Sequence, residues 1–342
     1  MVDFRKALLL LAVLVFATGI VSAQALNCTL NGGAPPLLRA EGVAEEVGQA
    51  FITCTGGAPT TPGQPLPRIN VRLFTNGYNI TSKLIALSST VTASEATLLI
   101  DDPAPANQVW ATFPTPPQFP ACQAPYTGAA CGNMFFAHQV AGNPQAVEWR
   151  DIPFDPPGTG NRVLRFVNIR VNAALATGGN VTSLIPPPVN IFVSITGTLT
   201  LPITSPFLAV GYIQNGLNFT VTSTTFTQCG QGGSFTARFI EQFPNAFRVA
   251  GAPNPPFPYQ NDLTQIYNTE SMFWGGVPGD PNYLASTAGQ ATQATRLRIA
   301  FTGIPSGVNI TVPTTISSGS GTNASLVAVG VDVGLVGVAV LV

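Results

Sequence analysis

The chain has 342 residues, of which 8% are charged and 45% are hydrophobic, with 14 Lys and Arg against 15 Asp and Glu. This near-neutral balance excludes the basic field that attracts nucleic acid or an anionic membrane, and the apolar content excludes a chain that is disordered by composition. The 34 Gly and 31 Pro residues, with so little charge, favour strands and loops over helices.

Residues 1–25 are predicted to be a signal peptide. Two basic residues precede a mostly apolar run over 7–20, and small residues ending at Ala23 and Ala25 supply cleavage sites. The apolar run is too short for a comfortable membrane span. We therefore expect a secreted, extracellular or cell-surface protein, in which disulfide bonds can form.

A first module is expected over 26–203. Near its start it has three glutamates, at positions 41, 45 and 46. Adjacent glutamates on a strand point to opposite faces, so Glu45 and Glu46 cannot form an acid/base pair. The stretch also lacks the alternating Asp or Asn of a calcium loop. We interpret the three as a solvated turn before a strand over 47–55, without catalytic or metal-binding chemistry.

All five cysteines follow the signal, and their spacing predicts two disulfides, Cys28–Cys54 and Cys122–Cys131. Cys229 is left either as a buried thiol or in an alternative pairing. The chain has no C-x-x-C pair and one histidine, so we expect no zinc, no other metal and no cofactor.

Strict alternation of apolar and polar residues predicts strands over 69–73 and 191–199, and a further strand is predicted over 96–100. The side chains expected to be buried are Ile69, Val71, Ile191, Val193 and Ile195, and those expected to be exposed are Arg72 and Thr196. Asp101 and Asp102 follow the strand at 96–100 and precede Pro103. Asp-Pro at the end of a strand is common in turns, so we interpret the two aspartates as part of a turn and not as a calcium site.

The segment 101–160 reads as a loop insertion, rich in Pro and aromatic residues and pinned by the second disulfide. It contains His138, the residue on which any Ser-His-Asp or Cys-His arrangement would depend. Because the chain has no G-x-S-x-G motif, we expect a packed or hydrogen-bonded histidine instead.

A boundary near Leu201–Pro206 separates this module from a second β-rich module over 204–316. Its strands are predicted over 235–239 and 297–301, with Leu297, Ile299 and Phe301 buried and Arg298 exposed. Short strands with Pro/Gly turns predict an all-β fold, an antiparallel β-sandwich of Ig-like or related type in two modules with long loops.

Aromatic residues in the loop-rich region 253–274 are the best candidates for a binding site. Tyr259, Tyr267 and Trp274 lie near amides and carboxylates, a combination that suits stacking on a sugar ring or contact with a protein. Covering one end of a small sandwich is the structural alternative. A carboxylate pair drawn from Asp262, Glu270 or Asp280 would suit a hydrolase, but no spacing supports it.

The segment 317–342 is a Ser/Gly linker followed by a Val/Gly-rich tail. Asp332 interrupts the apolar run, so a strand or a truncated reading frame fits better than a lipid-anchor signal. Membrane contact is expected only if this tail anchors the protein. The chain also has six N-x-S/T triplets, which would be glycosylation sites in a eukaryotic secretory pathway.

Three blocks of the chain resemble a group of exported, β-rich proteins of Acidobacteria-type bacteria. They are NCTLNGGAPPLLRAEGVAEEVGQAFITCTGG, NRVLRFVNIRVNA and TRLRIAFTGIPSGVNITVP. The resemblance implies export and a β-rich fold, and it implies no activity, ligand or catalytic residue.

The sequence favours a non-catalytic structural or adhesive protein of the cell surface or extracellular space, able to self-assemble or to contact surface glycans. The alternatives are a carbohydrate-binding module that uses the loop aromatics and, more weakly, a secreted hydrolase. Binding to nucleic acid is not expected.

Overall fold

The computed structural model describes residues 24–82, 84–86, 92–104, 107–109, 111, 122–222, 232–244 and 246–247, and shorter pieces between 296 and 341. This part of the chain is almost entirely β-structure, as the sequence predicted. Its helices are the short turns α2 (Gly128–Cys131) and α3 (Ala173–Thr177). None of the helices in these ranges is long and apolar enough to cross a membrane.

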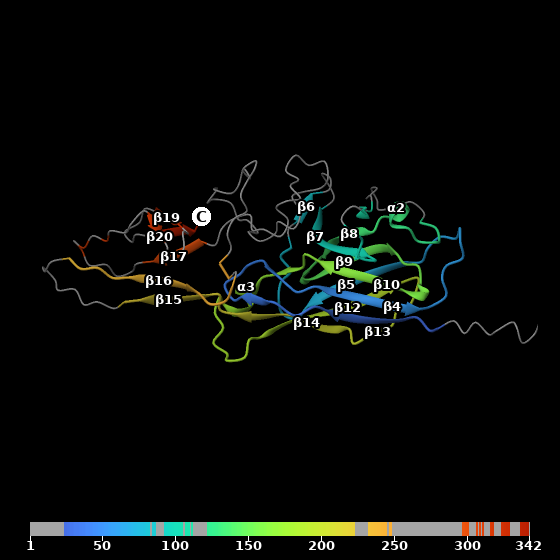
Figure 1. Cartoon of the computed structure of the whole chain (residues 1–342), viewed down its shortest axis with the longest axis horizontal. Helices are drawn as coiled ribbons and strands as arrows, with labels where there is room; N and C mark the ends of the chain where they lie inside the picture. The colour runs from blue at the N-terminus through green and yellow to red at the C-terminus, as the bar shows by residue number, and fades with distance from the viewer. Residues whose placement is uncertain are drawn as a thin grey trace, which may run out of the picture.

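Twelve strands form one large sheet (Figure 1). In chain order they are β1 (Asn27–Gly32), β2 (Leu37–Arg39), β4 (Ala50–Gly56), β5 (Arg68–Thr75), β6 (Leu84–Ala86), β7 (Thr92–Ile100), β8 (Met134–Val140), β9 (Asn143–Pro153), β10 (Gly158–Val167), β12 (Pro188–Gly197), β13 (Ile203–Thr204) and β14 (Phe207–Gln214). Their order across the sheet is β13-β1-β4-β10-β7-β8-β9-β5-β12-β14-β2, with β6 beside β7. The pairs β1–β13 and β2–β14 are parallel, and the other pairs are antiparallel.

The sheet curls until its two ends approach each other. Strands β13 and β14 lie nine places apart in the sheet, which in a flat sheet would separate them by about 43 Å. Only Ser205 and Pro206 join them, and that link spans at most about 11 Å. Ser205 makes the corner with φ of 55°, and the Gly48 N–H donates to the Val210 carbonyl, 2.6 Å away.

The curled sheet encloses one hydrophobic core. Trp149 on β9 and Phe166 on β10 belong to different halves of the sheet, and their ring centroids lie 5.0 Å apart. Both side chains are buried, with Ile52 and Leu164 among the residues around them. The core therefore holds the two halves together from the inside, and the outer face of the sheet is left to carry function.

Most of the predicted inward positions are confirmed. Those buried are Ile69, Val71, Ile191, Val193 and Leu297. Ile195 and Ile299 are only half-buried, because each lies close to the end of its strand, and Arg72 is half-buried as well. Thr196 is exposed as predicted, whereas Phe301 and the side chain of Arg298 lie outside the described residues.

The predicted antiparallel sandwich modules are replaced, in the described residues, by one curled sheet of mixed direction. The stretch 134–160, expected inside a loop insertion, holds β8 and β9, which lie in the middle of the sheet between β7 and β5. The predicted boundary at residue 203 falls within β13, and the sheet continues beyond it through β14. The physical reason is the corner at Ser205, which carries the chain from one end of the sheet to the other.

Smaller sheets complete the described structure. One pairs β3 (Glu45–Glu46) with β11 (Arg170–Val171), and another pairs β15 (Leu217–Val221) with β16 (Ala237–Glu241). A third contains β17 (Arg296–Ala300), β18 (Thr315–Ser317), β19 (Asn323–Ala328) and β20 (Val336–Leu341).

Candidate functional site

A groove of about 420 Å³ lies on the outer face of the large sheet, over β5, β12 and β14. It is lined by Phe74, Thr75, Asn76, Asn190, Ile191, Phe192, Phe207, Leu208 and Ala209. No charged side chain is among them. A neutral ligand with both apolar and polar surface would therefore match this lining best.

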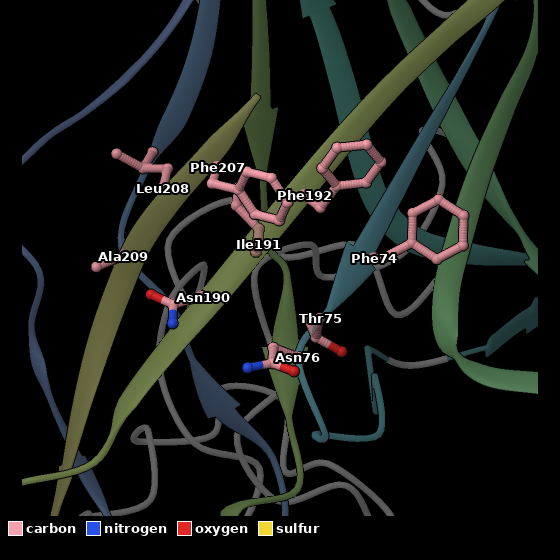
Figure 2. A pocket seen from close by; sticks show the side chains of 9 residues that line it. All are labelled: Phe74, Thr75, Asn76, Asn190, Ile191, Phe192, Phe207, Leu208 and Ala209. Atoms are coloured by element: carbon pink, nitrogen blue, oxygen red, sulfur yellow. The ribbon is translucent and has the colours of Figure 1, made fainter. Parts of the chain in front are cut away.

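Three phenylalanines form a row across the strands at one end of the groove (Figure 2). Phe192 lies directly opposite Phe74 on β5 and opposite Phe207 on β14. The ring centroids are 6.0 Å apart for the first pair and 4.8 Å apart for the second, and both pairs are tilted. The arrangement follows from alternation, because the neighbouring Leu73, Ile191 and Val193 point into the core.

The row is more exposed than a structural packing role requires. The side chain of Phe207 is 68% exposed, and Phe192 is half-buried between its two neighbours. The exposed ring of Phe207 leaves apolar area in contact with water, and an apolar patch of this kind is a candidate binding surface.

Two amides lie two positions along the strands from the rings. Asn76 is exposed and Asn190 half-buried, and the Asn76 N–H donates to the Asn190 carbonyl at 3.0 Å. Figure 2 shows Asn76 beside Thr75 and Asn190 on the side of Ala209, both at the other end of the groove from the rings. Within the described ranges their side-chain amides make no hydrogen bond to protein, so their donors and acceptors are open to a ligand.

The charges beside the row form a network of two arginines and one glutamate. Arg72 lies over the ring of Phe74, with its guanidinium carbon 5.9 Å from the ring centroid. Glu148 accepts from Arg72 at 3.0 Å and from Arg150 at 2.9 Å. Desolvation raises the pKa of Glu148, but the hydrogen bonds and charges of Arg150 and Arg72 outweigh it, so the net pKa is lowered. The glutamate stays ionised as part of a salt-bridge network and not as a proton donor.

The sequence did not single out the groove. Tyr259, Tyr267 and Trp274 lie outside the described residues, as do Asp262, Glu270 and Asp280. Sequence reasoning missed Phe74, Phe192 and Phe207 because each was taken as one more apolar residue of a strand that also supplies the core. The signal that could have found them is an aromatic residue at an outward position of an alternating strand.

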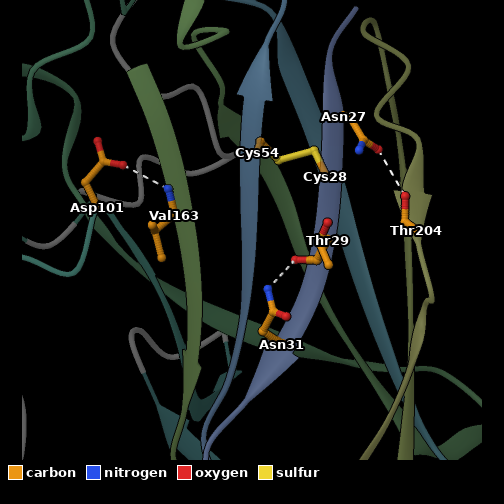
Figure 3. The surroundings of a disulfide bond; sticks show 8 residues. All are labelled: Asn27, Cys28, Thr29, Asn31, Cys54, Asp101, Val163 and Thr204. Carbon is orange, nitrogen blue, oxygen red and sulfur yellow. Dashed lines mark hydrogen bonds between the residues drawn. A yellow bond between two sulfur atoms is a disulfide. The ribbon is translucent and has the colours of Figure 1, made fainter. Parts of the chain in front are cut away.

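The structure brings both predicted cysteine pairs to disulfide distance. Cys28 and Cys54 face each other across β1 and β4, with Cα atoms 4.0 Å apart (Figure 3). Cys122 and Cys131, whose Cα atoms are 5.4 Å apart, lie in a small cluster with Leu66. Disulfide pairs of this kind indicate an oxidising environment. Cys229 lies outside the described residues.

The predicted solvated turn at the three glutamates is wrong for Glu45. That side chain is 1% exposed and accepts hydrogen bonds from the Arg39 backbone N–H and from Arg39 Nε, at 3.1 and 2.8 Å. Glu46, which is 37% exposed, pairs with Arg170 at 3.2 Å. Glu41 accepts from the N–H groups of Gly216 and Leu217. Glu41 and Glu46 thus join segments distant in sequence, whereas the buried Glu45 pairs with a residue six positions away.

Asp101 and Asp102 turn the chain after β7, with φ of 61° and 42°. Asp101 pairs with Arg162 at 2.7 Å, and Asp102 pairs with Arg165 at 2.6 Å. Among the described residues, no three side chains of His, Cys, Asp or Glu gather closely enough to hold a metal ion. Both aspartates are thus engaged by cations of the protein itself.

His138 lies half-buried on β8, directly opposite Glu148 on β9. Desolvation and the charge of Arg150 lower its pKa, and the charge of Glu148 only partly opposes them. The imidazole is therefore held in its neutral form near neutral pH.

A scan against protein-family models finds no match for this chain, and neither does a search of curated proteins.

Proposed function

We propose that the protein is an exported, non-catalytic adhesive protein, and that the groove over β5, β12 and β14 binds a neutral carbohydrate chain. The signal segment, the disulfide pairs and the resemblance to exported bacterial proteins support export. The observation that carries the binding proposal is the row of Phe74, Phe192 and Phe207 beside two open amides.

Each half of the groove suits a different part of a sugar ring. The negative face of an aromatic ring attracts the C–H groups on the flat side of a pyranose, and three rings at strand spacing extend that contact along a chain. Side-chain amides both donate and accept hydrogen bonds, which matches the hydroxyls at the edge of the same sugar. The lining itself carries no charge to attract an acidic glycan, and Arg72 beside Phe74 is already paired with Glu148.

Adhesion fits the site better than catalysis. Hydrolysis of a glycosidic bond needs two carboxyl groups placed around the bond, and no carboxylate lines the groove. Glu148 is occupied by Arg72 and Arg150. A separate sandwich-like module stays a prediction for the parts of the chain beyond the large sheet, and the proposed site does not depend on it.

Binding to an array of neutral and acidic polysaccharides tests the proposal. Phe192→Ala removes the central ring, and we expect it to weaken binding of a neutral glycan about tenfold or more, as the loss of one well-packed aromatic contact does. Phe239→Ala is the matched control, because it removes a ring that is also half-buried but lies on β16, outside the groove.

Three results would contradict the proposal. The first is unchanged binding in a folded Phe192→Ala variant. The second is binding that survives this change but is lost in Trp274→Ala, which would assign the ligand to the loop aromatics instead. The third is a preference for acidic over neutral glycans.

A further inference from the structure

Strands β15 and β16 form a two-stranded arm that pairs with no other strand in the described residues. Figure 1 shows the arm extending away from the large sheet, with β15 along its outer side. Phe219 and Phe239 lie opposite each other, with ring centroids 5.0 Å apart, yet Phe219 is 45% exposed and Val221 is 48% exposed. An isolated pair of strands is marginally stable in water, and a third strand stabilises it.

The base of the arm is fixed to the large sheet by the acidic segment near the N-terminus. Glu41 accepts from the N–H groups of Gly216 and Leu217, at 2.9 and 3.2 Å, where β14 leads into β15. Arg39, held by Glu45, donates to the Ala246 carbonyl at 3.1 Å, just beyond β16. Both strands are thus anchored at the same end, which presents the arm in a defined direction.

The backbone hydrogen bonds show which groups of β15 face outward. Thr222 N–H donates to the Thr236 carbonyl, and Gln242 N–H donates to the Gly216 carbonyl, each at 3.0 Å. Hydrogen-bonded pairs alternate along an antiparallel ladder. The even-numbered residues of β15 therefore bond to β16, and the N–H and C=O groups of Phe219 and Val221 point to the free edge.

The free edge of β15 lacks the features that normally prevent strands from associating. Its sequence, Leu-Asn-Phe-Thr-Val, has no charge, no Pro and high β-propensity. Exposed edges are usually protected by Lys, Pro or a bulge. The opposite strand β16 carries Arg238 and Glu241, so the unprotected edge is β15.

We propose that β15 pairs antiparallel with β15 of a second copy of this chain, about a two-fold axis at Thr220. The two copies of Thr220 then face each other. Phe219 of each copy lies opposite Val221 of the other. These are the residues whose backbone groups point outward. Aromatic–β-branched and Thr–Thr cross-strand pairs are both favourable, no like charges meet, and the contact is isologous. The result is a four-stranded sheet shared by two molecules.

Proline substitutions on the two edges of the arm provide a matched test. Val221 and Ala237 face each other in the arm, and each has its N–H directed away from the partner strand. Proline at either position removes one outward donor and leaves the pairing of β15 with β16 in place. Sedimentation of the full exported chain should show a dimer for the wild type and for Ala237→Pro, and a monomer for Val221→Pro.

Cysteine cross-linking tests the register. Residues facing each other in a non-hydrogen-bonded antiparallel pair have Cα atoms about 4.5 Å apart, which a disulfide can span. In a Cys229→Ser background, Thr220→Cys should form a cross-linked dimer on mild oxidation, and Asn218→Cys should not.

A wild-type chain that is monomeric at its highest soluble concentration would overturn the proposal. So would a dimer that dissociates with Ala237→Pro and not with Val221→Pro, or one that cross-links through Asn218→Cys and not through Thr220→Cys. Because β15 lies outside the groove, a dimer without glycan binding, or glycan binding without a dimer, separates this proposal from the proposed function.

Discussion

Glu45 is a buried carboxylate whose charge is matched by Arg39, and its neighbour Glu46 is partly open to water. The difference follows from alternation along β3, which turns one side chain inward and the next one outward. A buried ion pair contributes little net stability, because desolvation opposes the attraction. Removing one partner is costly, because the other charge stays buried without compensation.

We therefore expect Glu45→Gln to lower the free energy of unfolding by about 3 kcal/mol, since it removes the negative charge that faces the guanidinium of Arg39 in this buried pair. Asp102→Asn is the control, at a salt bridge whose two side chains are both open to water. The Asp102 carboxylate is 51% exposed and its partner Arg165 is 25% exposed, so the change should cost at most about 1 kcal/mol. Urea unfolding of both variants measures the difference. Equal and small effects would show that Glu45 is solvated in solution, as the sequence alone suggested.

His138 makes the stability of the protein depend on pH. Burial and Arg150 depress its native pKa, so the unfolded chain binds the proton more readily than the native protein does. The stabilisation is present above the unfolded pKa of about 6.5 and is lost as the pH falls from there toward the native value. Because His138 is the one histidine in the sequence, no other imidazole titrates in that window.

Unfolding midpoints in urea between about pH 7.5 and about pH 5.5 test this dependence, above the range in which Glu148 contributes. The wild-type midpoint should fall toward the lower pH, whereas His138→Gln should show little change over the same range. Identical slopes for the two proteins would contradict a depressed pKa at His138.

At the scale of strands, local alternation was sufficient to predict the buried side chains wherever only one face of a strand meets the core. The pattern in β5 and β12 placed Ile69, Val71, Ile191 and Val193 correctly. It was insufficient for β8, where Phe135 and Phe136 are consecutive and both buried. That strand joins the two halves of the sheet, so both of its faces are covered and no alternation marks it.

Sequence also predicted the two cysteine pairs, because short separations and export make them chemically plausible. It did not predict the groove. Phe74, Phe192 and Phe207 are far apart in the chain and meet only because β12 pairs with both β5 and β14. A site built across strands in this way depends on the order of the strands, which periodicity does not encode.

The order of the strands is a property of the whole molecule. Strand β10 lies between β4 and β7, and β5 lies between β9 and β12. Such neighbours are distant in sequence, and turn motifs define only local hairpins. The predicted boundary near residue 203 rested on local composition, whereas the structure uses Ser205 and Pro206 as a corner that brings the ends of the sheet together.

This closure predicts that a fragment ending at the expected boundary does not fold. Residues 207–214 form β14, whose Val210 and Ile213 are 2% and 0% exposed in the core. The strand also supplies the partner of both β12 and β2. Without β14, apolar surface of Leu38 and Val189 would face water, and the backbone groups of β2 would lose their pairing.

We expect residues 24–203 to bind a hydrophobic dye and to be cleaved rapidly by protease, and residues 24–215 to unfold cooperatively in urea. The longer fragment ends before β15, so the arm does not influence the comparison. A fragment 24–203 that unfolds cooperatively, with a midpoint close to that of 24–215, would show that the chain divides at residue 203 as its composition suggested. A failure of 24–215 alongside 24–203 would show instead that residues beyond 215, among them the Gly216 and Leu217 that Glu41 binds, are needed to hold the curled sheet closed.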